Sequence, residues 1–207
     1  MSASQQYSFY CEKNIMENKL NEIIKLHKKD IPYTYEFDIP PIQIKSFNYS
    51  KKVIEFGSLK NKINQNSDYV LVLIGYEQVG EIKKVVFSNS FYIPSKISTK
   101  IKGNLNLNYI NDLENKIKSF ERGKHTAARN WAKQERKTVK NFESLYDVRF
   151  KIDSKIQRRI QCSLKLDTFF DFFEVNQITN HLKIPSINSP SRKFKKKTEI
   201  LEEVNAA

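Results

Sequence analysis

Arginine side chains begin abruptly along this sequence, and their spacing indicates phosphate binding. The chain has 207 residues, and no arginine precedes Arg122. In a helix, five basic side chains of this region fall within an arc of about 100°. They are Arg129, Lys133, Arg136, Lys137 and Lys140. Such a row of cations can contact successive phosphates, and arginine adds a bidentate geometry that lysine lacks.

The sequence around this predicted helix continues the positive charge. Residues 115–160 hold 14 basic and 5 acidic side chains. The further candidate nucleic-acid contacts are Arg122, Lys124, Lys155, Arg158 and Arg159. The opposite arc carries Ala128, Trp131 and Val139, so we expect Trp131 to pack in a core rather than stack on a base. The alternative to nucleic-acid binding is an ordinary solvated helix face.

A second set of candidate residues lies between two predicted strands. Asp68 opens an apolar strand, and Glu81, followed by Ile82 and Lys83, opens the next strand. This order, an Asp, a hairpin and then Glu-x-Lys, resembles the PD-(D/E)xK family of metal-dependent nucleases. The resemblance implies that Asp68 and Glu81 hold Mg²⁺ and that Lys83 assists the attacking water. A nuclease of this type is the alternative enzymatic function; the leading interpretation assigns no catalytic residue.

Four phenylalanines lie within five residues near the end of the second predicted region. They are Phe169, Phe170, Phe172 and Phe173. In a helix, Phe170 points away from the face that the other three share. Two interpretations stay open: the cluster forms the centre of a helical core, or it is an interface for another protein subunit.

Other patterns of catalysis and metal binding do not occur in the sequence. It has no Gly-rich phosphate loop, no G-x-S-x-G motif and no paired-histidine motif. The two cysteines, Cys11 and Cys162, and the three histidines are too scattered for a zinc site. We therefore expect no metal and no cofactor, and the distant cysteines fit a reducing intracellular compartment.

The sequence patterns around these residues predict an α+β fold in three parts. Residues 1–100 combine a helix over 11–28 with a small, mostly antiparallel sheet. The predicted strands are 33–38, 42–47, 51–56, 69–75 and 82–93. Residues 109–184 predict a basic unit of three helices, helix-turn-helix-like in outline, whose third helix runs from Lys155 towards Phe173. Residues 94–108 indicate a linker, and residues 185–207 a flexible basic tail.

Composition narrows the function classes. The net charge is +13 and the pI is about 9.6, which predicts a polyanionic partner. No apolar run approaches the roughly 18 residues of a membrane span, and the first residues lack the pattern of a signal peptide. The leading prediction is a non-catalytic nucleic-acid-binding protein, DNA favoured, that acts in the nucleus as an accessory subunit of a nucleic-acid-processing complex. Besides the nuclease, a structural RNA-bound protein of ribosomal type is an alternative.

Overall fold

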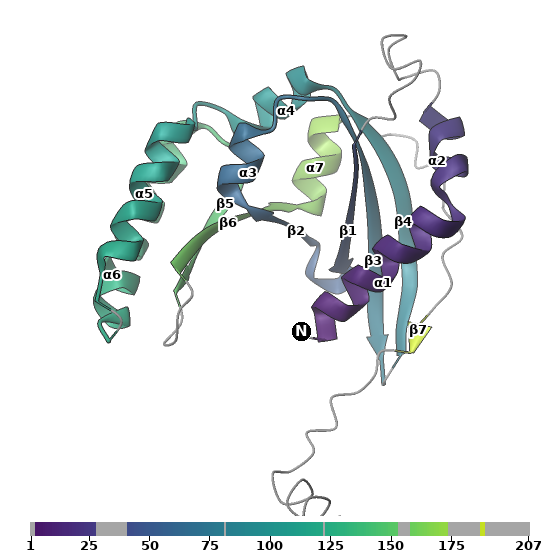
Figure 1. The fold of residues 1–207 in the computed structure, drawn as a ribbon, viewed down its shortest axis with the longest axis horizontal. Helices are drawn as coiled ribbons and strands as arrows, with labels where there is room; N and C mark the ends of the chain where they lie inside the picture. The colour runs from purple at the N-terminus through teal and green to yellow at the C-terminus, as the bar shows by residue number, and fades with distance from the viewer. Residues whose placement is uncertain are drawn as a thin grey trace, which may run out of the picture.

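The computed structural model describes residues 3–27, 41–80, 82–121, 123–152, 158–173 and 187–188. They form an α+β fold, as the sequence predicted (Figure 1). The helices are α1 (Ala3–Asn18), α2 (Leu20–His27), α3 (Leu59–Asn64), α4 (Ser95–Lys102), α5 (Leu107–Ser119), α6 (His125–Val139) and α7 (Leu166–Phe173), with 3-10 turns η2 (Tyr49–Lys51) and η3 (Lys140–Phe142). Sheet A has the order β1 (Ile42–Asn48), β3 (Tyr69–Val79), β4 (Ile82–Ile93) and β7 (Ile187–Asn188). Sheet B has the order β2 (Val53–Ser58), β6 (Arg158–Lys165) and β5 (Asp147–Ile152).

Sheet A is covered on both faces. Its strand β3 is a continuous apolar run, which is typical of a strand with two buried faces. Val70, Val72 and Ile74 pack with Ile15 of α1 and Ile23 of α2. The intervening side chains of β3, such as Leu71 and Leu73, point into the larger core. β1 is parallel to β3, whereas β3 and β4 form an antiparallel hairpin.

Sheet B is covered by helices on one face. Apolar side chains alternate along its strands, with Ile160, Cys162 and Leu164 buried on β6. Ile110, Leu113 and Ile117 on α5 are also buried, and α5 and α6 lie together along this sheet (Figure 1). The other face carries polar and charged side chains, and we call it the open face. Ser163, near the end of β6, lies on this face and is buried. The face also carries Glu55, Asp147, Arg149, Lys151, Arg159, Gln161 and Lys165.

The two sheets belong to one core. The chain leaves sheet A at the end of β1, turns through η2 and enters sheet B as β2. β2 then pairs with β6, about a hundred residues later in the chain. The larger core accordingly extends from Phe47 to Phe169. This ladder and this core cross the boundary that the sequence predicted near residue 100.

Several predicted elements are confirmed, and others are wrong. The single helix predicted over 11–28 is two helices, α1 and α2. The predicted strands from 42 onwards correspond to β1–β4, whereas the run 33–38 and most of the basic tail lie outside the described residues. The predicted linker contains α4. Residues 158–165, predicted within a third helix, form β6, because their alternating apolar side chains are buried when β6 pairs with β2 and β5. Helix α7 begins only at Leu166.

Candidate nucleic-acid interface

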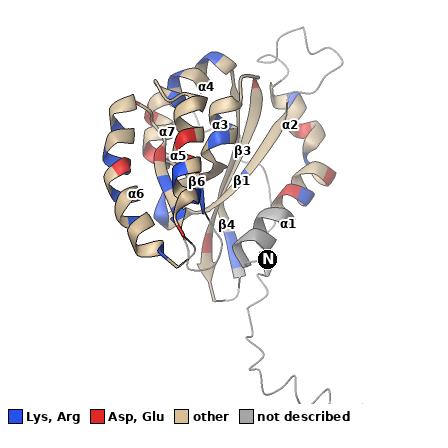
Figure 2. Cartoon of the chain, turned by 60° about the vertical axis from the view of Figure 1, so that its left-hand side comes forward, with Lys and Arg blue, Asp and Glu red and all other residues tan. Residues whose placement is uncertain are grey.

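Helix α6 has the two faces that its sequence predicts. Ala128, Ala132 and Val139 are buried. Trp131 packs against Phe120 and, edge to face, against Phe150 of β5, with a ring-centroid distance of 5.6 Å to Phe150. The packing role predicted for Trp131 is therefore confirmed. The predicted cations of the other face are all exposed, and Figure 2 shows basic positions on α6 and on the neighbouring part of sheet B.

The two arginines of α6 form hydrogen bonds within the chain. Arg129 donates from Nε and Nη2 to the carbonyl oxygen of Ile152, at 3.3 and 3.1 Å. Arg136 donates from Nη2 to Oδ1 of Asp147 at 2.6 Å. Both partners belong to β5, the edge strand of sheet B, so α6 runs antiparallel to this strand along its edge. The planar, multi-donor groups of Arg129 and Arg136 hold α6 on the sheet edge, and the prediction that these arginines contact phosphate stays a prediction.

Asp147 connects α6 to the open face of sheet B. Its Oδ2 accepts from Arg149 Nε at 3.3 Å, and Arg149 Nη1 lies 3.3 Å from Glu55 Oε1 on β2. Partial burial of Asp147 opposes its ionisation, but hydrogen bonds and charges from Arg136 and Arg149 outweigh this effect and lower the pKa of Asp147. Asp147 is therefore a carboxylate at neutral pH, and both of its oxygens are engaged.

The other acidic side chains of this region are also engaged. Glu135 on α6 accepts a hydrogen bond from Tyr109 of α5 at 2.6 Å. Glu143 accepts one from Asn104 at 3.4 Å. Burial, followed by the hydrogen bond and charge of Glu135, raises the pKa of Tyr109. Glu135 and Glu143 therefore hold elements together, and neither forms an ion pair with a lysine of the described segments.

Six basic side chains of α6, η3 and sheet B have no carboxylate partner among the residues that the structure describes. They are Lys133, Lys137, Lys140, Lys151, Arg159 and Lys165. We call them the cation band. Lys124 instead pairs with Glu121 at 3.1 Å, and Arg158 is half-buried at the start of β6. The predicted contacts Arg122 and Lys155 lie outside the described residues.

The register of sheet B places like charges together. Lys151 of β5 lies directly opposite Arg159 of β6, and Arg149 lies opposite Gln161. Like charges in a cross-strand pair are destabilising unless an anion lies between them. Arg159 and Lys165 share the open face of β6 and lie six residues apart, which is about 20 Å along a strand. This face can therefore follow several successive phosphates.

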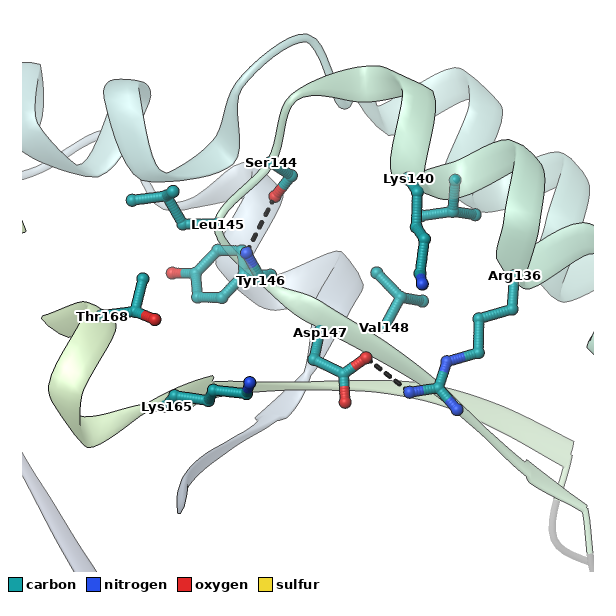
Figure 3. A pocket seen from close by; sticks show the side chains of 10 residues that line it. Arg136, Lys140, Ser144, Leu145, Tyr146, Asp147, Val148, Lys165 and Thr168 are labelled. Atoms are coloured by element: carbon teal, nitrogen blue, oxygen red, sulfur yellow. Dashed lines mark hydrogen bonds and ion pairs between the residues drawn. The ribbon is translucent and has the colours of Figure 1, made fainter. Parts of the chain in front are cut away.

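The cation band ends at a pocket of about 300 Å³ beside the start of β5 (Figure 3). Figure 3 shows Arg136 and Lys140 reaching in from the α6 side and Lys165 from the end of β6. The complete lining is Arg136, Val139, Lys140, Ser144, Leu145, Tyr146, Asp147, Val148, Lys165 and Thr168. Sequence reasoning missed Lys165 and Thr168, because they come from a strand and a helix that were predicted as one continuous helix.

The residues of the nuclease resemblance do not meet. Asp68 accepts hydrogen bonds from Tyr92 and from the backbone N–H of Ser95, the first residue of α4. Lys83 lies opposite Gln78, so ten residues of β3, about 33 Å, separate its register from Asp68. Glu81 lies outside the described residues. The nuclease pattern needs Asp68 to hold the ion and Lys83 to lie beside the attacking water, so this separation contradicts the predicted site of Asp68, Glu81 and Lys83.

Both Asp68 and Lys83 have structural surroundings instead. Partial burial of Asp68 opposes ionisation, but its hydrogen bonds from Tyr92 and Ser95 outweigh this and lower its pKa. Lys83 is buried with its ammonium 4.3 Å from the ring centre of Tyr76, and burial lowers its pKa. Across the described ranges, no group of three or more His, Cys, Asp or Glu side chains could hold a metal ion.

Three phenylalanines of the cluster pack in or against the core. Phe169 is buried, and its ring lies edge to face with Phe91 of β4 at 5.0 Å. Phe170 packs against Phe87 at 6.0 Å. Phe172 is half-buried against the same core, and the side chain of Phe173 is outside the described part. Of the two open interpretations, the structure supports the core.

A second cluster of cations, which sequence reasoning missed, lies inside the molecule. Lys62 of α3 is 6% exposed, and its ammonium donates to the side-chain oxygens of Gln43 and Gln65. Burial and the nearby Lys45 lower the pKa of Lys62 to about 8. Lys102 is equally buried and donates to Gln65 O and Asn66 Oδ1 at 2.6 and 3.0 Å. These lysines are unavailable to a surface ligand.

Comparisons of the chain with protein-family models, with curated proteins and with solved structures found no match. Among the helices within the described segments, none has the length and apolar character that crossing a membrane requires.

Proposed function

We propose that the protein binds the phosphate backbone of nucleic acid, DNA in the first instance, through the cation band. The observation that carries the proposal is that the charged side chains of this surface have two different roles. Arg129 and Arg136 fix α6 on the sheet edge, and the neighbouring carboxylates are engaged with Arg136, Arg149, Tyr109 and Asn104. The lysines are thereby left uncompensated, which suits an external polyanion.

The geometry favours affinity without sequence preference. Lysine side chains on a helix and on a flat sheet face contact backbone charges, and such contacts position a protein without reading bases. Binding should therefore weaken steeply with salt, because each neutralised phosphate releases condensed counterions. An accessory, non-catalytic role in a nuclear nucleic-acid-processing complex remains part of this proposal, and the location of the tagged full chain in cells tests the nuclear part.

The test compares two variants that lose the same charge from different surfaces. The first replaces Lys133, Lys140, Lys151 and Lys165 of the cation band with Gln. The control replaces four exposed lysines of α3, β4 and α4 with Gln: Lys60, Lys84, Lys96 and Lys100. Affinity for a duplex and for a single strand is measured by fluorescence anisotropy at several salt concentrations.

We expect the cation-band variant to lose at least about tenfold in affinity, and its log–log salt slope to fall by up to about four for a duplex. The control variant should keep most of both, because its lysines lie on other elements. Equal losses in the two variants would show that only net charge matters, and unchanged binding in both would contradict the interface. Matched RNA ligands distinguish the RNA-bound alternative.

A further inference from the structure

The pocket at the end of the cation band differs from the rest of the band in shape and in chemistry. The band itself runs over an exposed helix and an open sheet face, whereas the pocket is a hollow of about 300 Å³. That volume is at the small end of ligand sites in proteins. Side chains from five elements and one loop converge on it: α6, η3, the loop after η3, β5, β6 and α7. The backbone of a continuous nucleic-acid strand can lie along the cation band. The pocket, in contrast, suits a group at the end of such a strand.

The charges of the pocket match a doubly charged anion. Arg136, Lys140 and Lys165 contribute three positive charges, and Asp147 contributes one negative charge. Asp147 accepts from Arg136 through one oxygen and from Arg149 through the other, so guanidinium groups occupy both oxygens. Lys140 and Lys165 are exposed and have no carboxylate partner within the described segments. The net balance of the lining is therefore two positive charges.

The remaining lining supplies one hydroxyl and an apolar wall. Ser144 accepts from the backbone N–H of Tyr146 and donates to the carbonyl oxygen of Ile101 at 3.2 Å, so its hydroxyl is engaged within the chain. Thr168, on the first turn of α7, offers its hydroxyl to the pocket. Val139, Leu145 and Val148 form the apolar part. Such a wall can contact a sugar ring, whereas an inorganic anion alone would leave it unused.

We propose that this pocket binds a phosphomonoester dianion, such as the terminal phosphate of a nucleic-acid strand whose backbone follows the cation band. A terminal phosphate carries close to two negative charges at pH 7, whereas an internal phosphodiester carries one. Charge-assisted contacts from Arg136, Lys140 and Lys165 discriminate between the two. Where the ligand is the end of a nucleic-acid strand, the inference rests on the proposed function. A free mononucleotide carries the same phosphomonoester group.

The experiment uses the full chain and oligonucleotides of one sequence that differ only in their ends. One carries a 5′-phosphate, one a 3′-phosphate and one hydroxyls at both ends. We expect one phosphorylated end to bind about tenfold more tightly than the hydroxyl-ended strand. Lys165→Gln and Thr168→Val should remove this preference. Lys133→Gln loses the same charge on α6 outside the pocket and should keep it, because its effect falls on all three strands equally.

The outcomes separate this inference from the proposed function. Equal affinity for all three strands would overturn the binding of strand ends in the pocket while leaving backbone binding intact, and no binding to any strand would overturn the proposed function. Competition by a nucleoside monophosphate, with inorganic phosphate as reference, then tests the pocket without a strand. If the mononucleotide binds in the pocket and a phosphorylated end gives no preference, the ligand is a free phosphomonoester. If it fails to bind, and no strand end is preferred, the pocket assignment falls.

Discussion

The lysines of sheet A and those of sheet B differ in burial. On sheet A, Lys45 and Lys83 lie under packed elements, and burial lowers the pKa of each. On sheet B, Lys165 is exposed and Lys151 is half-buried on the open face. Both sheets draw on the same lysine-rich composition. The number of covering layers, and not the count of basic residues, therefore decides which charges can meet a polyanion.

The largest expected effect tests how closely the larger core packs on one face of sheet A. A Cβ at Gly75 of β3 would lie 2.8 Å from Tyr49 Cδ2, 3.0 Å from Phe87 Cβ and 3.3 Å from Phe47 Cζ. Gly75→Val should therefore lower the free energy of unfolding by about 3 kcal/mol through overpacking. Gln161→Val, on the open face of β6, should change it by no more than about 0.5 kcal/mol. Urea denaturation of both variants measures the contrast, and similar values would refute the difference between the sheets.

A buried and an exposed lysine give the second test, through the dependence of stability on pH. The pKa of Lys62 is about 8 in the folded chain and 10.5 in the unfolded chain, so between these values the unfolded state binds more protons. Stability due to Lys62 therefore rises with pH across this window, and its charged form costs stability below pH 8. Lys62→Met should stabilise the protein at pH 7 by about 1–2 kcal/mol, less than the full shift, because Gln43 and Gln65 lose a donor.

The matched control for Lys62 is Lys165→Met, which should leave stability at pH 7 nearly unchanged. The quantity to measure is the difference in unfolding free energy between variant and wild type from pH 7 to 9. The difference is needed because burial raises the pKa of Cys162 to about 12, so this thiol lowers stability as pH rises above 9. If the difference in unfolding free energy for Lys62→Met does not change with pH, Lys62 is hydrated in the folded chain. The contrast between Lys62 and Lys165 would then be refuted.

The comparison also shows which features of the fold the sequence could predict. β3 was predictable because seven consecutive apolar residues suit only a strand buried on two faces. β6 was missed because Ile160 and Leu164, four residues apart, also fit one face of a helix, and the phenylalanines beyond them favoured a helix. Its true partner, β2, lies about a hundred residues earlier, and no local pattern reports that pairing.

The candidate site was predictable in part, because local patterns can be read from the sequence and long-range contacts cannot. The phase of α6 follows from helical geometry, so its exposed cations and its packing side were both correctly assigned. The partners of its arginines were not predictable, because Ile152 and Asp147 reach them only when β5 lies along the helix. The pocket required Lys165 and Thr168, whose placement depends on where β6 ends and α7 begins.

The smallest expected effect concerns the arginines that join α6 to sheet B. Arg136→Gln removes the 2.6 Å contact to Asp147, so the pKa of Asp147 should rise. The two side chains are 48% and 39% exposed, so the loss of stability at pH 7 should be at most about 1 kcal/mol. The contribution of Asp147 exists above its unfolded pKa and disappears as pH falls through its lower folded pKa, so the variant should differ least from wild type in acid.

Titration of the Asp147 carboxyl by NMR distinguishes this structural role from a free phosphate contact. Lys137→Gln is the control, because it removes one charge at the next position of α6 without touching a carboxylate. If only Arg136→Gln moves the pKa, the abrupt appearance of arginine along the chain reflects the need for planar donors that attach a helix to an edge strand. If both variants leave it unmoved, Arg136 points to solvent and belongs with the lysines of the cation band.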